Sequence, residues 1–313
     1  MELDVIAIGE PLIEFNQTGG VGSNQYLQGF GGDSSNFAIA AARQGARAGY
    51  ITALGDDTYG RMFLDLWKAE DVDTSGVKID GSAPTAVSFV THSEKGHAFH
   101  YYRAGSAASR IGPADIDRDL VASAKVLHVS GIGLAISANA CDACYHAVEI
   151  AKAAGHTVSF DTNLRLRLWS KERARAVITD MMGLCDICLP SYDDVVVLTG
   201  IEDEDTLVDF ALTCGAEVVA LKLGERGAIV ANARERHRIA PFSVTPVDAT
   251  GAGDTFGGAF VTRLIRGDDL ATAGRYAAVA AALSTTGFGA VAPIPKAEQV
   301  EKALASYPGP IKS

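Results

Sequence analysis

A glycine-rich turn that ends in an acid, Gly251-Ala252-Gly253-Asp254, is the part of the sequence best suited to catalysis. The apolar residues that follow it recur at helical spacing, so we expect the turn to begin a helix. The first N–H groups of a helix have no partner within it and lie at the positive end of the helix dipole, which makes them an anion site. A carboxylate beside that site could take a proton from a hydroxyl group that attacks a bound phosphoryl group. The alternative is an ordinary glycine-rich helix cap with an acid in its first turn.

The longer string around this turn, residues 248–256 (DATGAGDTF), resembles the C-terminal signature of the ribokinase-like (PfkB) carbohydrate and nucleoside kinases. Residues 29–36 (GFGGDSSN) are similar to the N-terminal signature of the same family. The resemblance implies that Asp254 is the catalytic base and that the backbone amides of residues 251–253 form an anion hole.

Three residues of the N-terminal signature are candidates for binding a sugar. Gly32 allows the backbone to approach a ligand closely, and Asp33 and Asn36 offer short polar groups suited to sugar hydroxyls. The alternative is that an Asp or Ser here only caps the helix that follows.

Strand-like runs alternate with helical runs along most of the chain, which predicts the α/β class, with a mainly parallel central sheet and helices on both faces. Short buried strands are expected at Val5–Gly9, Ala48–Leu54, Ala124–Val129, His156–Asp161, Cys185–Leu189 and Val218–Leu223. Helices are expected at Asn36–Gln44, Tyr59–Ala69, Ser137–Ala154, Lys171–Met182 and Thr206–Cys214. A further strand-like run, Phe242–Val247, leads into the glycine-rich turn. No linker or repeat divides the sequence, so residues 1–313 are expected to form one domain, and the resemblance implies the ribokinase-like three-layer fold.

Two segments, at about 12–30 and 85–103, alternate like antiparallel strands, with polar turns such as residues 94–97 (EKGH). We expect them to form a small sheet that protrudes from the main domain, which in the resembling family is a lid over the sugar. The edges of so small a sheet usually need covering. We therefore expect a homo-oligomer, most simply a homodimer, that buries apolar lid residues such as Phe89 or Phe99.

The composition excludes several classes of function. A formal charge of −11, from 27 basic and 38 acidic residues, argues against a nucleic acid or an anionic membrane surface as partner. No apolar run approaches the ~20 residues needed to span a bilayer. The first residues, MELDVIAIG, lack the basic region of a secretion signal, so we expect a cytoplasmic protein.

Two C-x-x-C pairs, Cys141/Cys144 and Cys185/Cys188, raise the possibility of a zinc site. The first pair falls in an expected helix and the second in an expected strand, and neither has the Gly or Pro turn of a metal knuckle. Reduced, mostly buried thiols are therefore favoured.

Two other phosphate-binding motifs can be set aside. The sequence has no G-x-x-x-x-G-K-[ST], which excludes a P-loop enzyme. Residues 129–136 (VSGIGLAI) imitate a dinucleotide loop only in part, because Ile136 stands at the third glycine position. A dehydrogenase is therefore not favoured.

Aromatic and basic residues suggest how a charged sugar could be held. Tyr101, Tyr102 and Arg103 end the second lid segment, where they could close over a ligand, with the arginine gripping a carboxylate, or could only solubilise an exposed strand. Arg165 and Arg167 follow an expected buried strand, and open α/β sheets place ligands at this end of their strands. For Arg167, pairing with the acidic surface is the favoured interpretation.

These stretches, with the opening residues 9–15 (GEPLIEF), resemble the 2-keto-3-deoxygluconate kinases. The resemblance implies that the Tyr-Tyr-Arg stretch and Arg165 bind a keto-acid, and that Asn163 lies toward the nucleotide phosphates.

The loop that contains Lys222, Gly224 and Gly227 is similar to the nucleotide loop of the family, although a plain β-hairpin turn is also possible. The family usually has Asn-x-x-Glu where this chain has Ser191 and Asp194, a pattern that helps organise Mg²⁺ through waters. The shorter acid puts direct metal ligation in doubt, while Mg²⁺ is still needed to screen the phosphates of ATP. The alternative for Asp194 is an acid in the first turn of a helix.

Residues 287–290 (GFGA) fall where the family has its adenine pocket and sometimes a K⁺ site shared with Asp248 and Thr250. A serine often found just beyond is Pro293 here, which leaves open whether a monovalent cation is used.

We therefore expect an ATP-dependent kinase that phosphorylates a primary hydroxyl of 2-dehydro-3-deoxy-D-gluconate. One alternative is a kinase of the same fold that acts on fructose or ribose. Another is a catalytically silent sugar- or nucleotide-binding protein, which the intact Gly-Ala-Gly-Asp sequence disfavours.

Overall fold

The computed structural model describes residues 2–93 and 96–307, which form two sheets. The larger sheet has nine strands in the order β13-β12-β11-β10-β9-β8-β1-β4-β5. Neighbouring strands from β5 to β11 are parallel, while β12 and β13 add an antiparallel hairpin at one edge. The strands are β1 Leu3–Ile8, β4 Ala48–Gly55, β5 Asp73–Asp80, β8 Ala124–Ser130, β9 Thr157–Asp161, β10 Ile187–Cys188, β11 Val218–Lys222, β12 Ala228–Asn232 and β13 Arg236–Ile239.

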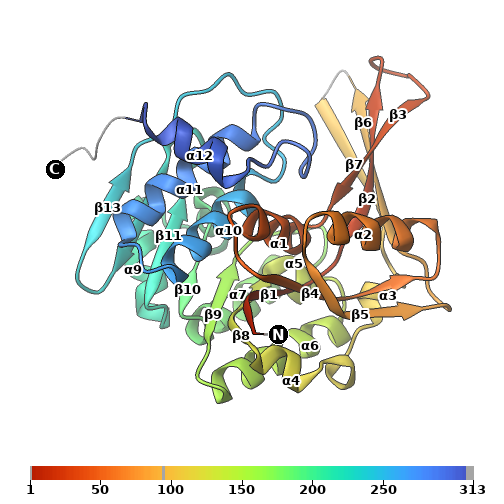
Figure 1. Cartoon of the computed structure of the whole chain (residues 1–313), viewed down its shortest axis with the longest axis horizontal. Helices are drawn as coiled ribbons and strands as arrows, with labels where there is room; N and C mark the ends of the chain where they lie inside the picture. Colours follow the sequence, from red (N-terminus) through yellow and green to blue (C-terminus); the bar gives the residue numbers. More distant parts are fainter. Residues whose placement is uncertain (1, 94–95, 308–313) are drawn as a thin grey trace.

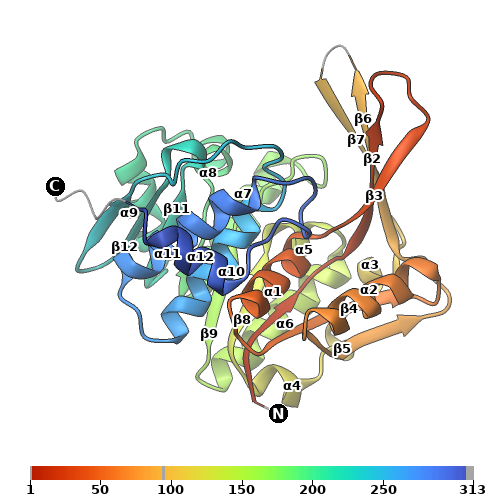
Figure 2. The ribbon, with the colours of Figure 1, turned by 45° about the horizontal axis from the view of Figure 1, so that its top comes forward.

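Helices cover both faces of this sheet, as Figures 1 and 2 show, and each face has its own hydrophobic core. Successive residues of the central strand β1 point to opposite sides, so Val5 and Ala7 join one core while Ile6 and Ile8 join the other. The helices on the first side are α1 Asp33–Arg43, α2 Thr58–Ala69, α10 Ala252–Ile265, α11 Leu270–Ser284 and α12 Ala297–Leu304. The helices on the second side include α4 Arg118–Ala122, α5 Gly131–Ala135, α6 Ala138–Ala153, α7 Lys171–Leu184, α8 Tyr192–Thr199 and α9 Glu204–Cys214.

The smaller sheet, which we call the lid, has the strand order β3-β2-β6-β7 and protrudes from the main domain (Figure 2). Its strands are β2 Leu12–Thr18, β3 Gln25–Gly31, β6 Ala86–Ser93 and β7 Gly96–Tyr102. The two hairpins are antiparallel, as expected, and are joined through a parallel pairing of β2 with β6. The expected turn at 94–97 lies partly outside the described residues.

The expected α/β architecture and the lid are confirmed, two local expectations need correction, and the edge strand β5 was not expected. The run at Phe242–Val247 forms no strand, because Pro241 and Pro246 interrupt it and proline cannot donate to a strand ladder. The strand expected at Cys185–Leu189 is reduced to two residues, Ile187–Cys188. The edge strand β5 was missed because most of its residues are at least partly exposed, so it has no apolar alternation.

Candidate active site

The glycine-rich turn begins helix α10, as the sequence predicts. Gly251 is the residue before the helix and has φ of 77°, a left-handed conformation that favours glycine. A Cβ on Gly251 would also lie 3.0 Å from the carbonyl oxygen of Ala290. Asp254 falls in the first turn, directly after the amides of residues 251–253. The backbone thus forms the geometry of an anion site with a carboxylate beside it.

Helices α1 and α10 pack closely, and this packing brings the two signatures together. A Cβ on Gly258 would lie only 2.7 Å from the carbonyl oxygen of Phe37, so glycine is needed for the contact. As a result, Asn36 Nδ2 donates a hydrogen bond of 2.8 Å to Asp254 Oδ2. The side chain of Asn36 thereby orients the carboxylate at the anion site.

Asp33 and Asn36 are buried at the start of α1 and have oxygens available for a ligand. Asn163 Nδ2 donates to Asp33 Oδ2 over 2.9 Å. Asp33 Oδ1 and Asn36 Oδ1 are buried without a hydrogen-bond partner among the described residues. Buried oxygens of this kind are normally satisfied, so a ligand with hydroxyl donors would fit them. The alternative of a helix cap does not hold for Asp33, because the residue before the helix is Gly32, with φ of 108°.

Asp254 has the electrostatics of a general base. Burial raises its pKa to about 7, and the nearby charges of Asp33 and Asp161 act in the same direction. The hydrogen bond from Asn36 and the charge of Lys222 oppose this rise. A carboxyl group with a pKa near neutrality can accept a proton efficiently at physiological pH.

Lys222 and Asp161 form an ion pair across the carboxyl ends of β11 and β9. A Cβ on Gly253 would lie 3.4 Å from Lys222 Nζ, so the ammonium lies against the start of α10. The loop after Lys222 contains Gly224 and Gly227, with φ of 62° and 89°. This loop joins the antiparallel strands β11 and β12, so the expected hairpin turn is present beside the anion site.

Ser191 and Asp194 lie at the start of α8, as the sequence predicts for an acid in the first turn. Ser191 makes no side-chain cap hydrogen bond, so its hydroxyl is free of that role. Asp194 Oδ2 accepts a hydrogen bond of 3.0 Å from Leu164 N, and burial raises the pKa of Asp194. No group of three or more His, Cys, Asp or Glu in the described ranges could hold a metal alone. One carboxylate and a hydroxyl still fit Mg²⁺, which keeps several waters and binds through substrate phosphates.

The two faces of the lid differ in what they contact. The register places Glu14, Ser88 and Tyr101 side by side on one face. The charge of Asp248 adds to burial in raising the pKa of Glu14, so this face is turned toward the loop before α10. Tyr102 lies on the opposite face, where its ring meets Phe89 edge-on at 5.8 Å.

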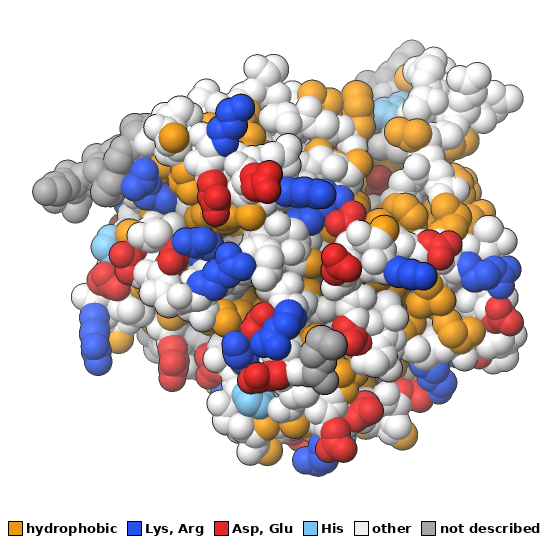
Figure 3. Space-filling view, in the orientation of Figure 1, with side chains coloured by type: hydrophobic (Ala, Val, Ile, Leu, Met, Phe, Trp, Pro, Cys, Tyr) orange, Lys and Arg blue, Asp and Glu red, His pale blue; other side chains and the backbone are white. Residues whose placement is uncertain are grey.

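The structure therefore separates Tyr102 from the other proposed substrate residues. The face that carries Tyr102 packs against α2, through contacts such as Phe30 with Phe63. Figure 3 shows hydrophobic side chains gathered around the base of the lid and α2.

Arg103 is already paired within the chain. It donates to Glu10, whose side chain is fully buried, and Ser106 Oγ donates to the other oxygen of the same carboxylate over 3.3 Å. Its guanidinium lies 5.2 Å from the centre of the Tyr101 ring. Glu10 thus neutralises the guanidinium that the sequence assigned to a substrate carboxylate.

Arg165 and Arg167 differ in their surroundings. Arg165 is exposed at the end of β9, donates from Nη1 to Leu164 O over 2.8 Å, and has no carboxylate partner within the described ranges. Its charge favours the ionised forms of Asp33 and Asp194. The sequence predicted that Arg167 pairs with an acid, but among the described residues it forms no ion pair and donates instead to Phe99 O of the lid over 2.9 Å.

Several site residues were not found from the sequence. Glu10 and Asp161 form ion pairs with residues far away in the chain, Arg103 and Lys222, and no residue spacing in the sequence indicates such pairs. Glu14 offers a half-buried carboxyl without a partner among the described residues, and Ser88 Oγ beside it is buried and unpartnered.

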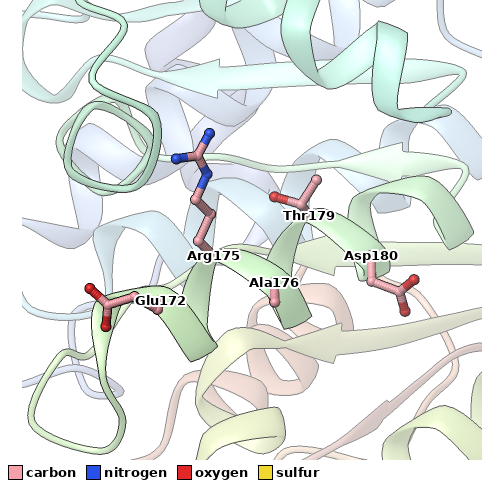
Figure 4. A pocket seen from close by; sticks show the side chains of 5 residues that line it. All are labelled: Glu172, Arg175, Ala176, Thr179 and Asp180. Atoms are coloured by element: carbon pink, nitrogen blue, oxygen red, sulfur yellow. The ribbon is translucent and has the colours of Figure 1, made fainter.

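A surface hollow elsewhere has no chemical role that we can identify. Figure 4 shows that its lining comes from α7 alone, with side chains pointing outward. Its lining residues are Glu172, Arg175, Ala176, Thr179 and Asp180. None of them belongs to the site described above.

The chain is similar to known carbohydrate kinases over nearly its whole length. The model of the pfkB family carbohydrate kinases matches residues 3–297. The chain is 36% identical over 315 residues to the 2-dehydro-3-deoxygluconokinase of Thermoproteus tenax, covering 96% of this chain and 95% of that protein. It is 34% identical over 314 residues to fructokinase-2 of Solanum habrochaites, covering 94% of each.

A solved structure shares the fold. An E. coli protein assigned as ribokinase II, in complex with ATP and Mg²⁺, superposes with a TM-score of 0.90 at 27% identity, over 97% of this chain and 100% of that one. The fold is thus ribokinase-like. None of the described helices has the length and apolar content needed to cross a membrane.

Proposed function

Because the chain belongs to the pfkB family of carbohydrate kinases, we propose that it transfers the γ-phosphoryl group of ATP to the 6-hydroxyl of 2-dehydro-3-deoxy-D-gluconate. The observation that carries the choice of a sugar acid is Arg165. This guanidinium stands at the ligand end of β9, has no carboxylate partner among the residues that the structure describes, and is close enough to influence Asp33 and Asp194. A sugar carboxylate would supply the missing partner.

The residues of the site have distinct tasks in this reaction. Asp33 and Asn36 accept hydrogen bonds from sugar hydroxyls through the oxygens that have no partner in the part of the chain that the structure describes. Asp254 takes the proton of the attacking hydroxyl, and the amides of residues 251–253 stabilise charge on the transferring group. Lid residues such as Tyr101 exclude water, which would otherwise attack ATP.

Mg²⁺, when bound with ATP, would neutralise charge on the phosphates. Ser191 and Asp194 at the start of α8 are the residues that would hold it, through waters and the phosphates themselves. The loop with Lys222, Gly224 and Gly227 would lie beside the nucleotide, as would Asn163. A monovalent cation and a cytoplasmic location stay predictions of the sequence.

A neutral ketose such as fructose is the second candidate substrate. The observation in its favour is the ion pair between Arg103 and Glu10, because a paired Arg103 is less available to a substrate carboxylate than Arg165 is. Fructokinases are also among the relatives of similar identity.

The deciding experiment measures kcat/KM for the keto-acid and for fructose in the wild type and in Arg165→Ala. If Arg165 binds the acid, its loss removes a charged hydrogen bond and should lower kcat/KM for the acid by ~10–150-fold, while fructose changes by less than ~3-fold. A matched control is Arg175→Ala, an exposed arginine of α7 outside the site, which should alter neither value.

Two results of this comparison would contradict the proposal. Equal losses on both sugars in Arg165→Ala would assign Arg165 to ATP binding or to the fold. A wild-type enzyme that prefers fructose would replace the sugar acid with the second candidate, because sites built for a polar group reject analogues lacking it by up to ~10⁴-fold.

A further inference from the structure

Lys222 and Asp161 form a buried ion pair at the edge of the anion site, with side chains 10% and 5% exposed. They end β11 and β9, which flank the two-residue strand β10. Two charges taken out of water add little to stability, because their desolvation offsets their attraction. Stability is therefore a weak explanation for a charged pair at this position.

The ammonium of Lys222 faces the place where a phosphoryl group would bind. A Cβ on Gly253 would lie 3.4 Å from Lys222 Nζ and 3.9 Å from Cδ. Because Gly253 has no side chain, nothing at that residue separates the lysine from the amides that begin α10. An anion held by these amides would therefore meet the ammonium as well.

The charges around the site also call for a cation here. The charges of Asp33 and Asp161 raise the pKa of Asp254, and the charge of Asp161 also raises the pKa of Asp194. The site is therefore rich in carboxylates. The phosphates of ATP would be repelled by them. Lys222 counteracts the carboxylates at both Asp254 and Asp194, which places its charge between the base and the start of α8.

We propose that Lys222 is a catalytic residue whose ammonium contacts the transferring phosphoryl group and offsets its negative charge, while Asp161 positions that ammonium. In the transfer, the sugar oxygen forms a bond to the γ-phosphorus and the bond from that phosphorus to the β–γ bridging oxygen breaks, its electron pair leaving with ADP. The sugar proton passes to Asp254. Lys222 itself forms and breaks no covalent bond, and its role rests on the proposed phosphoryl transfer but not on which sugar accepts the group.

The test compares Lys222→Met, which removes the charge, with Lys222→Arg, which keeps it. Loss of one preorganised donor at a developing charge typically costs 10²–10³ in kcat, so Lys222→Met should fall by about that factor while KM for the sugar stays unchanged. Lys222→Arg should recover most of the rate. The control is Lys152→Met, which removes a lysine from an exposed pair with Asp186 and should leave kcat unchanged.

A double variant separates catalysis from folding. Lys222→Met alone leaves Asp161 buried without its cation, so its Tm should fall. Adding Asp161→Asn removes that unpaired charge and should restore Tm, yet the double variant should stay as slow as Lys222→Met. Recovery of turnover together with Tm would overturn the proposal, as would wild-type kcat in Lys222→Met.

The pH profile gives an independent readout. Lys222 opposes the rise in the pKa of Asp254, so its removal should move the acid limb of kcat to higher pH. Asp33 from α1 and Asp161 from β9 face the same group and remain in place in Lys222→Met. If the acid limb of kcat stays at the same pH in Lys222→Met, the result would contradict the proposal that the charge of Lys222 acts at the reacting atoms.

The choice of sugar does not affect this test. The loss in Lys222→Met should be the same factor on the keto-acid and on fructose, because the lysine acts on the phosphoryl group. If the wild type prefers fructose, the substrate proposal fails while the comparison on fructose still decides the role of Lys222.

Discussion

Asn36 and Asp254 are 218 positions apart in the chain, and a hydrogen bond of 2.8 Å from Asn36 Nδ2 to Asp254 Oδ2 joins them. The bond holds the carboxylate of one signature in the orientation set by the other. It also favours the ionised form of Asp254 against the burial that raises its pKa. Helices α1 and α10 thus both influence the protonation of Asp254.

Asp254→Asn should lower kcat by about 10²–10⁴-fold, the range typical of a lost general base, with ATP affinity little changed. The same variant should be more stable than the wild type at pH 8. The pKa of Asp254 is raised from 3.8 to about 7 in the folded state, so the cost of ionising the buried carboxyl builds up between these two pH values and is complete at pH 8, while near pH 4 most of the gain disappears. Thermal melts at both pH values, with steady-state kinetics, check this, and near-normal turnover would remove Asp254 from the mechanism.

The wild-type kcat/KM should rise with pH, with a midpoint at about 7, and then level off, because Asp254 must lose its proton to act as a base. Asp33→Asn removes a charge that raises the pKa of Asp254, so the midpoint of this rise should move to lower pH even though sugar binding also weakens. The midpoint is measured by determining kcat/KM from about pH 5 to 9, a range wide enough to define one titration. A midpoint that stays in place in Asp33→Asn would show that the two carboxyls are not coupled.

Arg103→Met should destabilise the protein strongly, because it leaves the buried carboxylate of Glu10 without its cation. Breaking a buried ion pair from one side costs about 3–5 kcal/mol. Adding Glu10→Gln should recover much of the free energy of unfolding, measured by urea titration. If Arg103→Met keeps wild-type stability and instead loses affinity only for the sugar acid, then Arg103 is a substrate ligand after all.

Two glycines of the turn should respond differently to alanine. In Gly251→Ala the alanine would have to adopt a left-handed φ, and its Cβ would lie 3.0 Å from the Ala290 carbonyl oxygen. The variant should therefore lose ~1–3 kcal/mol of stability. Gly253→Ala meets only Lys222, at ordinary contact distance, and lies within the helix, where alanine gains up to ~1 kcal/mol. Gly253→Ala should therefore fold well and still lose kcat, because the new methyl group stands between the amides and the lysine. Equal stability losses in both variants would contradict this geometry.

A homodimer through the lid stays a prediction. Phe99 is 42% exposed, whereas Phe89 is stacked on Phe15 within the sheet and offers less surface than expected. Light scattering at micromolar concentration should show a dimer, and Phe99→Glu should dissociate it. The exposed Ile79 at the edge of the main sheet provides the control, since Ile79→Glu should leave the dimer intact. A monomeric wild type would exclude the lid interface.

The elements and the glycine-rich turn could be predicted because their signals are local. Apolar periodicity located most helices and buried strands, and the turn at residues 251–254 has the composition of an anion site. The ion pairs Glu10–Arg103 and Asp161–Lys222 could not be predicted, because the partners are 93 and 61 positions apart in the chain and no local pattern indicates that they meet. For the same reason the pairing of Arg103 with Glu10 was not foreseen, and the binding of the substrate by Arg103 stays a prediction.

Gly32 alone stands between the lid strand β3, which ends at Gly31, and helix α1, which begins at Asp33. A Cβ there would lie 2.5 Å from the Glu10 carbonyl oxygen, so this joint has little room to lengthen or rotate. Any tilt of the lid therefore also moves Asp33 and Asn36 at the start of α1. A compound that wedges β3 away from the main domain should therefore inhibit by disordering sugar recognition, with no need to compete for the position of ATP.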